Sequence, residues 1–478
     1  MNPETFDAKT SDMGLCKPTM RVDYQWLTRA AATHALVLSL ALLLGACAGT
    51  TPYEIDLMPA PDVYEVDVID PLADATPLSD LPYNGVLYAT DRLPSDEGAK
   101  EHFYLNARGH VVRLGVCQVE VARADISWEE ARRISLLKNR TDKYPIRVSG
   151  VDEYGVLDRS ATDFTEPDTL GEDPHAAAAT FAAAVNAKLA QSKRKHVYVY
   201  VHGYKVVFEN PVLVATELWH FLGYDGVFVA YAWPSTPSRW AYAKDTETAV
   251  GYARNLRIFL EYLADETEAE QIHVIGYSAG TRLVARAFEQ LALMNHERTR
   301  EEIHDDLRIG HLILVGSDVD RQVFGVYIAE GLLKVPQHVS IYMSEQDKAL
   351  NVARFLTGQE RLGQMWAAGA PSQSVADYLH ESEAEISTIN VTSAEGSTSG
   401  NGHGYFRKSP WASSDILMTL AYDLLPAERG LVREAGSPVW TFPPDYIQRL
   451  RAALFKASPE LAKAVREQEV APQDSGAR

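Results

Sequence analysis

The sequence predicts an α/β protein built on a mostly parallel, doubly wound sheet with helices on both faces. Two observations predict this fold class. From His196 onward, apolar and β-branched stretches alternate with segments whose apolar residues recur at helical spacing. The pentapeptide Gly276-Tyr277-Ser278-Ala279-Gly280 lies between one such strand and one such helix. We expect right-handed crossovers between the parallel strands.

The expected elements follow from these patterns in chain order. The expected strands are Gly85–Thr90, Val111–Val121, His196–Val201, Gly226–Trp233, Gln271–Ile275, Leu307–Val315, His338–Met343 and Ile386–Val391, of which the last ends the sheet. The expected helices are His175–Leu189, Val214–Leu222, Thr246–Ala264 and, after the pentapeptide, Thr281–Met294. The region between Val121 and His175 has weak periodicity and predicts no regular element.

Residues 1–46 are predicted to form a leader that is removed from the mature chain. Ala30–Ala46 carries no charge and ends in the tetrapeptide Leu44-Gly45-Ala46-Cys47. This tetrapeptide resembles a bacterial lipobox, in which cleavage precedes a cysteine that becomes lipidated. The resemblance implies a mature protein that begins at Cys47 and is held to a membrane by two or three acyl chains. A single membrane-spanning anchor is the alternative, for which the apolar stretch is slightly short.

Residues 47–82 are predicted to be an acidic, proline-rich tether that holds the folded body away from the membrane. No lysine or arginine occurs between Arg29 and Arg92. A strap lying along the domain is the alternative, because the segment also contains four branched apolar residues, Val63, Val66, Val68 and Ile69. The catalytic domain is expected over 83–457, followed by a charged tail over 458–478.

Charge and cysteine content narrow the range of functions. The formal net charge of −20 argues against nucleic acid as a partner, since phosphate binding needs basic patches, and predicts weak attraction to anionic lipid. Of the three cysteines only Cys117 would remain unmodified in a mature chain, so no intramolecular disulfide is expected. No metal-binding spacing, phosphate loop or dinucleotide fingerprint occurs, so the sequence predicts no metal and no cofactor. It predicts no oligomeric state.

The pentapeptide has the pattern G-x-S-x-G at a strand-to-helix junction. In that context it describes a nucleophile elbow, a sharp turn that projects the Oγ of Ser278 above the sheet. Gly276 and Gly280 lack the side chains that would keep strand and helix apart. The amino end of the following helix directs its N–H groups at the site, where they favour developing negative charge. The junction therefore predicts a serine nucleophile.

A nucleophilic serine needs a histidine base and a carboxylate that orients the histidine. Enzymes with this elbow carry the three groups in the chain order serine, acid, histidine, after successive strands. Asp347 follows the strand that ends at Met343, and His403 follows the last predicted strand in a glycine-rich loop. We therefore predict a catalytic triad of Ser278, Asp347 and His403.

Other residues compete for these roles. Asp318 and Asp320 follow the preceding strand, where some hydrolases place their acid. His380 also comes after the predicted acid, but it precedes the last predicted strand. Arg282, in the first turn after the elbow, is unfavourable for the helix dipole and predicts a salt bridge with Asp318 or Asp320.

The oxyanion of the reaction is expected to bind backbone N–H groups. The strand His196–Val201 is followed by His202-Gly203-Tyr204, and the N–H of Gly203 or Tyr204 would pair with that of Ala279. We expect His202 to be a structural neighbour of this loop rather than a base. Trp233-Pro234-Ser235 either lines an acyl pocket or simply ends its strand.

Together these motifs resemble the α/β-hydrolase superfamily, and within it a large, poorly characterised bacterial family. The residues that carry the resemblance are Tyr88-Ala89-Thr90-Asp91-Arg92, His202-Gly203-Tyr204, Phe228–Pro234, Gly276–Gly280 with Arg282, Asp318-Val319-Asp320 before Phe324, Asp347-Lys348-Ala349-Leu350, Arg361-Leu362-Gly363 and the His403 loop. The resemblance covers roughly Tyr83 to Leu425 and implies the fold and the triad, but almost nothing about the substrate. The chain departs from the family at Ala279, where methionine is common. Only the backbone N–H is needed there, so we expect an effect on pocket shape.

These inferences predict a serine hydrolase of the bacterial envelope, a carboxylesterase or lipase that acts on small-molecule or lipid esters through an acyl-enzyme. The uncharged Ala48 after Cys47 resembles the default for sorting to the outer membrane, so we expect the protein on its periplasmic side. An amidase, peptidase or transacylase with the same triad is the first alternative. A non-catalytic envelope binding module is the second, although an intact set of serine, aspartate and histidine argues against it.

Overall fold

The computed structural model describes residues 53–64, 69–73, 75, 82–95, 103–121, 126–364, 371–459 and 461. The chain divides into two units, residues 1–51 and 52–478, and every described residue belongs to the second, which is compact by itself. The predicted leader, Cys47 and nearly all of the predicted tail lie outside the described residues. None of the helices that the structure describes has the length and the apolar run that crossing a bilayer requires.

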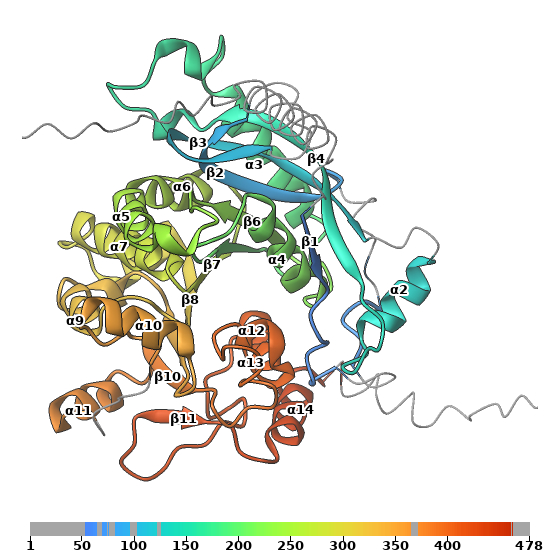
Figure 1. Cartoon of the computed structure of the whole chain (residues 1–478), viewed down its shortest axis with the longest axis vertical. Helices are drawn as coiled ribbons and strands as arrows, with labels where there is room; N and C mark the ends of the chain where they lie inside the picture. Colours follow the sequence, from blue (N-terminus) through green and yellow to red (C-terminus); the bar gives the residue numbers. More distant parts are fainter. Residues whose placement is uncertain are drawn as a thin grey trace, which may run out of the picture. The chain divides into compact units, whose positions relative to one another are not determined.

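The described strands form one sheet in the order β1-β4-β3-β2-β6-β5-β7-β8-β9-β10-β11 (Figure 1). Neighbours are parallel from β2 to β11 and antiparallel from β1 to β2. The antiparallel edge consists of β1 (Glu54–Asp56), β4 (Pro145–Val156) and β3 (Tyr104–Val121). The parallel strands are β2 (Val86–Pro94), β6 (Val227–Ala232), β5 (His196–Val201), β7 (Gln271–Tyr277), β8 (Ile309–Val315), β9 (His338–Met343), β10 (Ile386–Asn390) and β11 (Val439–Thr441). The predicted fold class, a mostly parallel α/β sheet, is confirmed.

The central strands form because they are nearly continuous apolar runs that helices cover on both faces. Every residue of β6 and of β8 is buried, and β7 is exposed only in part at its two ends. Cys117, on β3, is also buried, as expected of a small apolar side chain. The sheet is therefore the core of the unit. The loops that follow its parallel strands all emerge at one edge, beyond the carboxyl ends of these strands.

The helices connect these strands. Their bounds are α2 (Trp128–Ser135), α3 (Ala176–Leu189), α4 (Glu209–His220), α5 (Tyr242–Gly251), α6 (Ala253–Glu266), α7 (Gly280–Met294), α8 (Arg300–Leu307), α9 (Arg321–Ala329), α10 (Lys348–Thr357), α11 (Gln373–Glu381), α12 (Tyr405–Lys408), α13 (Pro410–Tyr422) and α14 (Tyr446–Ala457). The helix expected over Thr246–Ala264 is two helices, α5 and α6, which meet at Tyr252.

Three strands, β1, β4 and β11, were not predicted from the sequence, and one prediction was wrong. Ile386–Asn390 is not the last strand, because β11 follows it and pairs with it in parallel, with Ile389 opposite Trp440. At three residues β11 is too short to show a periodic pattern. The same holds for β1, and β4 is an antiparallel strand whose residues are only partly buried, so neither has a continuous apolar run.

The described residues 53–64 and 69–73, called the strap below, lie along the domain. β1 pairs with β4, and the N–H of Met58 donates to Glu217 Oε1 at 2.7 Å. Met58, Val63 and Leu72 are at most 2% exposed. The acidic residues of the strap led us to expect self-repulsion. Asp62 instead pairs with a cation of the domain, Lys138, at 3.0 Å. For these residues the tether expectation is corrected to its alternative, the strap.

Candidate active site

Ser278 occupies the sharp turn between β7 and α7. Its φ of +53° lies in the left-handed region that residues with a side chain rarely adopt. The turn is held by the Ser278 N–H, which donates to Val315 O at 2.9 Å, and by Thr281 Oγ1, which donates to Ser278 O at 2.6 Å. A Cβ at Gly280 would lie 2.1 Å from His202 O, so only glycine allows this approach of helix and loop. The junction therefore has the geometry of the predicted nucleophile elbow.

The structure brings the three predicted triad side chains together. Ser278 Oγ lies 2.7 Å from His403 Nε2, and His403 Nδ1 lies 2.6 Å from Asp347 Oδ2. The second carboxylate oxygen, Asp347 Oδ1, accepts the N–H of Leu350 at 2.9 Å and so caps the amino end of α10. With Nδ1–H donating to the carboxylate, Nε2 is free to accept the serine proton. The side chains thus form one continuous hydrogen-bonded chain.

The triad side chains are shielded from water. Ser278 is 5% exposed, Asp347 1% and His403 7%. The ring of Tyr277 packs against the imidazole of His403 with centroids 5.1 Å apart. Low exposure strengthens the electrostatic interaction between imidazole and carboxylate. The arrangement can therefore stabilise a positive charge on His403.

Two residues that sequence analysis did not single out, Gly316 and Tyr405, lie next to the triad. Gly316 follows β8 with φ +54°, and a Cβ there would lie 3.1 Å from His403 Cε1 and 3.2 Å from Nδ1. Its N–H donates to the hydroxyl of Tyr405 at 2.7 Å, and that hydroxyl donates to Tyr342 O at 2.8 Å. The tyrosine joins the ends of β8 and β9 beside the His403 ring. A single glycine at a strand end was the one sequence signal that could have pointed here.

The loop after β5 approaches Ser278 closely. A Cβ at Gly203 would lie 2.9 Å from Ser278 Cβ, so this position also needs glycine. Within the part of the chain that the structure describes, no hydrogen-bond acceptor takes up the backbone N–H of Tyr204 or of Ala279. Ala279 is the residue before α7, where the helix dipole is positive. The loop and the elbow thus supply the donors that an oxyanion would need.

His202 and Trp233 support this loop. Their rings stack with centroids 5.1 Å apart and an interplanar angle of 7°, and Trp233 Nε1 donates to His202 O at 2.6 Å. Burial lowers the pKa of His202 well below its ordinary value. The residue is therefore a neutral structural neighbour of the loop, as expected, and Trp233 is a buried packing partner at the end of its strand.

The competing residues have other partners. Arg282 Nε donates to Asp318 Oδ2 at 2.8 Å, which is the predicted salt bridge, and Tyr242 donates its hydroxyl to the same carboxylate. Asp320 accepts the N–H of Gln322 at 2.8 Å and caps α9. His380 lies in the last turn of α11. Of the candidate bases, His403 is the one whose imidazole contacts the serine hydroxyl.

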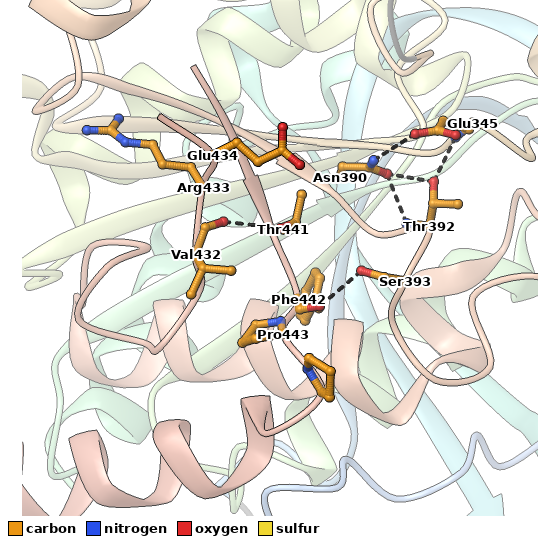
Figure 2. Close-up of a pocket in the computed structure, with 11 residues that line it drawn as sticks. Glu345, Asn390, Thr392, Ser393, Val432, Arg433, Glu434, Thr441, Phe442 and Pro443 are labelled. Atoms are coloured by element: carbon orange, nitrogen blue, oxygen red, sulfur yellow. Dashed lines mark hydrogen bonds between the residues drawn. The ribbon is translucent and has the colours of Figure 1, made fainter. Parts of the chain in front are cut away.

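A separate hollow of about 540 Å³ opens beyond the ends of β10 and β11 (Figure 2). Its polar wall is internally bonded, because Asn390 Nδ2 donates to Glu345 Oε1 at 3.0 Å and Thr392 Oγ1 donates to Asn390 Oδ1 at 2.6 Å. Glu345 is two residues before Asp347, so this hollow adjoins the loop that carries the acid. Among the described residues, no group of three or more His, Cys, Asp or Glu side chains is arranged to hold a metal ion.

A mostly parallel sheet with helices and a strand–serine–helix elbow defines the class of α/β-hydrolases. Residues 177–419, slightly more than half of the chain, match a family described as alpha/beta hydrolase of unknown function (DUF900). The chain belongs to this family, which confirms the resemblance drawn from its motifs. No curated protein and no solved structure matches the chain.

Proposed function

We propose that this α/β-hydrolase is a serine carboxylesterase or lipase that works through an acyl-enzyme on Ser278. The observation that carries the proposal is the continuous chain of contacts from Ser278 Oγ to His403, at 2.7 Å, and from His403 to Asp347, at 2.6 Å. This is the contact pattern by which a base activates a nucleophile and a carboxylate orients the base.

In the proposed reaction the Oγ of Ser278 attacks the acyl carbonyl while its proton passes to His403 Nε2. Asp347 stabilises the imidazolium that forms, and the N–H groups at Gly203 or Tyr204 and at Ala279 bind the oxyanion. His403 then protonates the leaving alkoxide and activates the water that hydrolyses the acyl-enzyme. A single oxyanion donor contributes about 10²–10³ in kcat in enzymes of this type.

We further propose that Cys47 carries the acyl anchor and that the protein faces the periplasm at the outer membrane. Six peptide units separate Cys47 from Tyr53, so this part of the chain spans at most about 20 Å. Tyr53 accepts a hydrogen bond from Asn210 Nδ2 at 2.8 Å, and Asn210 is in the first turn of α4, which follows β5 at the edge of the sheet that bears Ser278. A lipidated Cys47 would thus tether the folded domain to a bilayer through this short stretch of chain.

The test is hydrolysis of p-nitrophenyl esters of increasing acyl length, beside the matching p-nitroanilides, by the chain from Ala48 onward. We expect turnover of the esters that Ser278→Ala and His403→Ala both abolish. Preference for long chains would define a lipase, and preference for short chains an esterase. Turnover of the anilides alone would overturn the ester assignment in favour of an amidase. Globomycin, which blocks processing of lipoproteins, should leave an unprocessed precursor of the full chain, and unchanged processing would overturn the anchor.

A further inference from the structure

α10 lies in the segment that connects β9 to β10. This segment leaves the sheet after β9 and returns at Gly363, whose N–H donates to Ser317 O at 2.8 Å and whose carbonyl accepts the N–H of Ser344 at 3.1 Å. Both ends of the excursion are thus fastened to the edge that bears the triad. Within α10 only Leu350 and Ala353 are buried. The rest of the helix surface faces solvent.

The outward face of α10 is apolar. Val352 is 58% exposed, Phe355 87% and Leu356 63%, and their spacing of three and four residues puts them on one side of the helix. α9 adds Val323 at 41% and Val326 at 57%, and the N–H of Arg321, at the start of α9, donates to Glu360 O at 3.1 Å just after α10. We call these five residues the α9–α10 face. Large exposed apolar side chains gathered in this way usually mark a binding surface.

α10 carries exposed cations beside its apolar side chains, although the protein as a whole is acidic. The chain has a net charge of −20, yet α10 contains two cationic residues and no aspartate or glutamate. Glu360, which follows α10, pairs with Arg321 at 2.7 Å. Lys348 and Arg354, on α10, are exposed. The exposed Lys348 and Arg354 attract an anionic surface. An apolar helix face flanked by lysine and arginine is the pattern that binds a bilayer interface.

We propose that the α9–α10 face docks on the surface of an anionic phospholipid bilayer. The helix that inserts most apolar surface, α10, is capped by Asp347, so docking would hold the triad at the membrane and present it to lipid esters. This substrate class rests on the proposed esterase function, whereas docking itself needs no activity at Ser278. The net charge predicts weak attraction to anionic lipid, whereas docking depends on the charge of this face.

The test is co-sedimentation with vesicles, using the chain from Ala48 onward so that no acyl anchor contributes. Residues 52–478 form a compact unit, so this chain contains the whole folded part. We expect binding to vesicles of equal parts phosphatidylglycerol and phosphatidylcholine, and much weaker binding to phosphatidylcholine alone. Replacing both Phe355→Ser and Leu356→Ser should weaken binding at least about tenfold. Hydrolysis of a soluble short-chain ester should not change in this variant.

Phe164→Ser is the matched control, because Phe164 is 92% exposed in the loop between β4 and α3. It should bind vesicles as the unchanged protein does. Equal binding by the Phe355/Leu356 variant and the control, or no binding by the unchanged protein, would overturn the proposal. A dimer in solution that the Phe355/Leu356 variant loses, without vesicle binding, would overturn it in favour of a second copy. Ser278→Ala should bind fully, so loss of esterase activity with intact binding would contradict the function and leave docking standing.

Discussion

Arg282 donates to Asp318 at 2.8 Å, and this ion pair occupies a carboxylate that could have competed with Asp347 for the histidine. Arg282 is four residues after the nucleophile, in the first turn of α7, where a cation is unfavourable for the helix dipole. Asp318 is 2% exposed. The pair therefore compensates the dipole and fixes the loop after β8 against the elbow, without any contact to the imidazole.

Replacement of the two aspartates should separate their roles. Asp347→Asn removes the charge that orients His403, and we expect a loss of about 10⁴ in the rate of ester hydrolysis with a small effect on stability. Asp318→Asn should instead lower the free energy of unfolding by about 3 kcal/mol, because it leaves Arg282 without its partner. Folded Asp318→Asn protein should keep its activity. A loss of activity in Asp318→Asn comparable with that in Asp347→Asn would reverse the two assignments.

Gly316→Ala should impair the site through His403 alone. The added Cβ would lie 3.1 Å from His403 Cε1. The backbone of an alanine at this position would also have to keep a φ of +54°, which costs about 1–2 kcal/mol. We expect ester hydrolysis to fall by at most about 10²-fold, because the imidazole must shift by a few tenths of an ångström and a misplacement of about 1 Å has that effect. Gly325→Ala is the control, since no atom lies within 4 Å of a Cβ at that helical position. Full activity of folded Gly316→Ala would show that the imidazole does not depend on this gap.

The strap should contribute to stability through Glu217. Its side chain is fully buried and accepts both the N–H of Met58, at 2.7 Å, and Arg407 Nε, at 2.6 Å. We expect Glu217→Gln to destabilise the domain by about 3 kcal/mol in urea unfolding and to expose the strap to proteases. Glu261→Gln, which removes a surface pair with Arg257, should cost less than about 1 kcal/mol. Equal stability of the two variants would favour a loosely held tether.

Stability should fall between neutral and acidic pH through buried histidines at the end of the sheet opposite the triad. Burial lowers the pKa of His338 to about 4 and, together with the charge of Arg194, that of His196 to about 4. Both are near 6.5 in the unfolded chain. Above that pH both states are neutral and stability is constant. Below it the unfolded chain binds more protons, so stability decreases until the folded pKa is reached.

His338→Gln tests this dependence, because it keeps a polar side chain beside Ser387 without a titrating group. Urea unfolding followed from about pH 7.5 to about pH 4.5 should show a slope shallower than in the unchanged protein by at most about 1.4 kcal/mol per pH unit. His110→Gln, on β3 and away from these histidines, should keep the original slope. An unchanged slope in His338→Gln would assign the acid sensitivity to other groups.

Much of the fold was predictable because its central strands are unbroken apolar runs. β6 and β8 are buried along their whole length, and apart from His311 on β8 their residues are apolar. The antiparallel edge could not be predicted in the same way. β4 is partly exposed, and β1 is held by its pairing with β4 and by buried contacts of the strap, which a local pattern does not encode. The acidic composition of the strap suggested repulsion because its cationic partners come from distant parts of the chain.

For the site, chain order and strand ends were enough to choose residues that the structure brings into contact. Ser278, Asp347 and His403 each follow a strand whose apolar pattern was clear. The space that His403 occupies could not be predicted, because it depends on how closely Gly316, just after β8, approaches a loop almost ninety residues later. The catalytic roles of the three side chains remain a prediction that only activity can test.

Labelling with a fluorophosphonate probe tests the central claim most directly, since the probe reacts only with an activated serine hydroxyl. The chain from Ala48 onward should be labelled at Ser278, and Ser278→Ala and His403→Ala should both lose the label while remaining folded. Labelling that survives in either variant, or a folded unchanged protein that takes up no label, would contradict a nucleophile activated by His403.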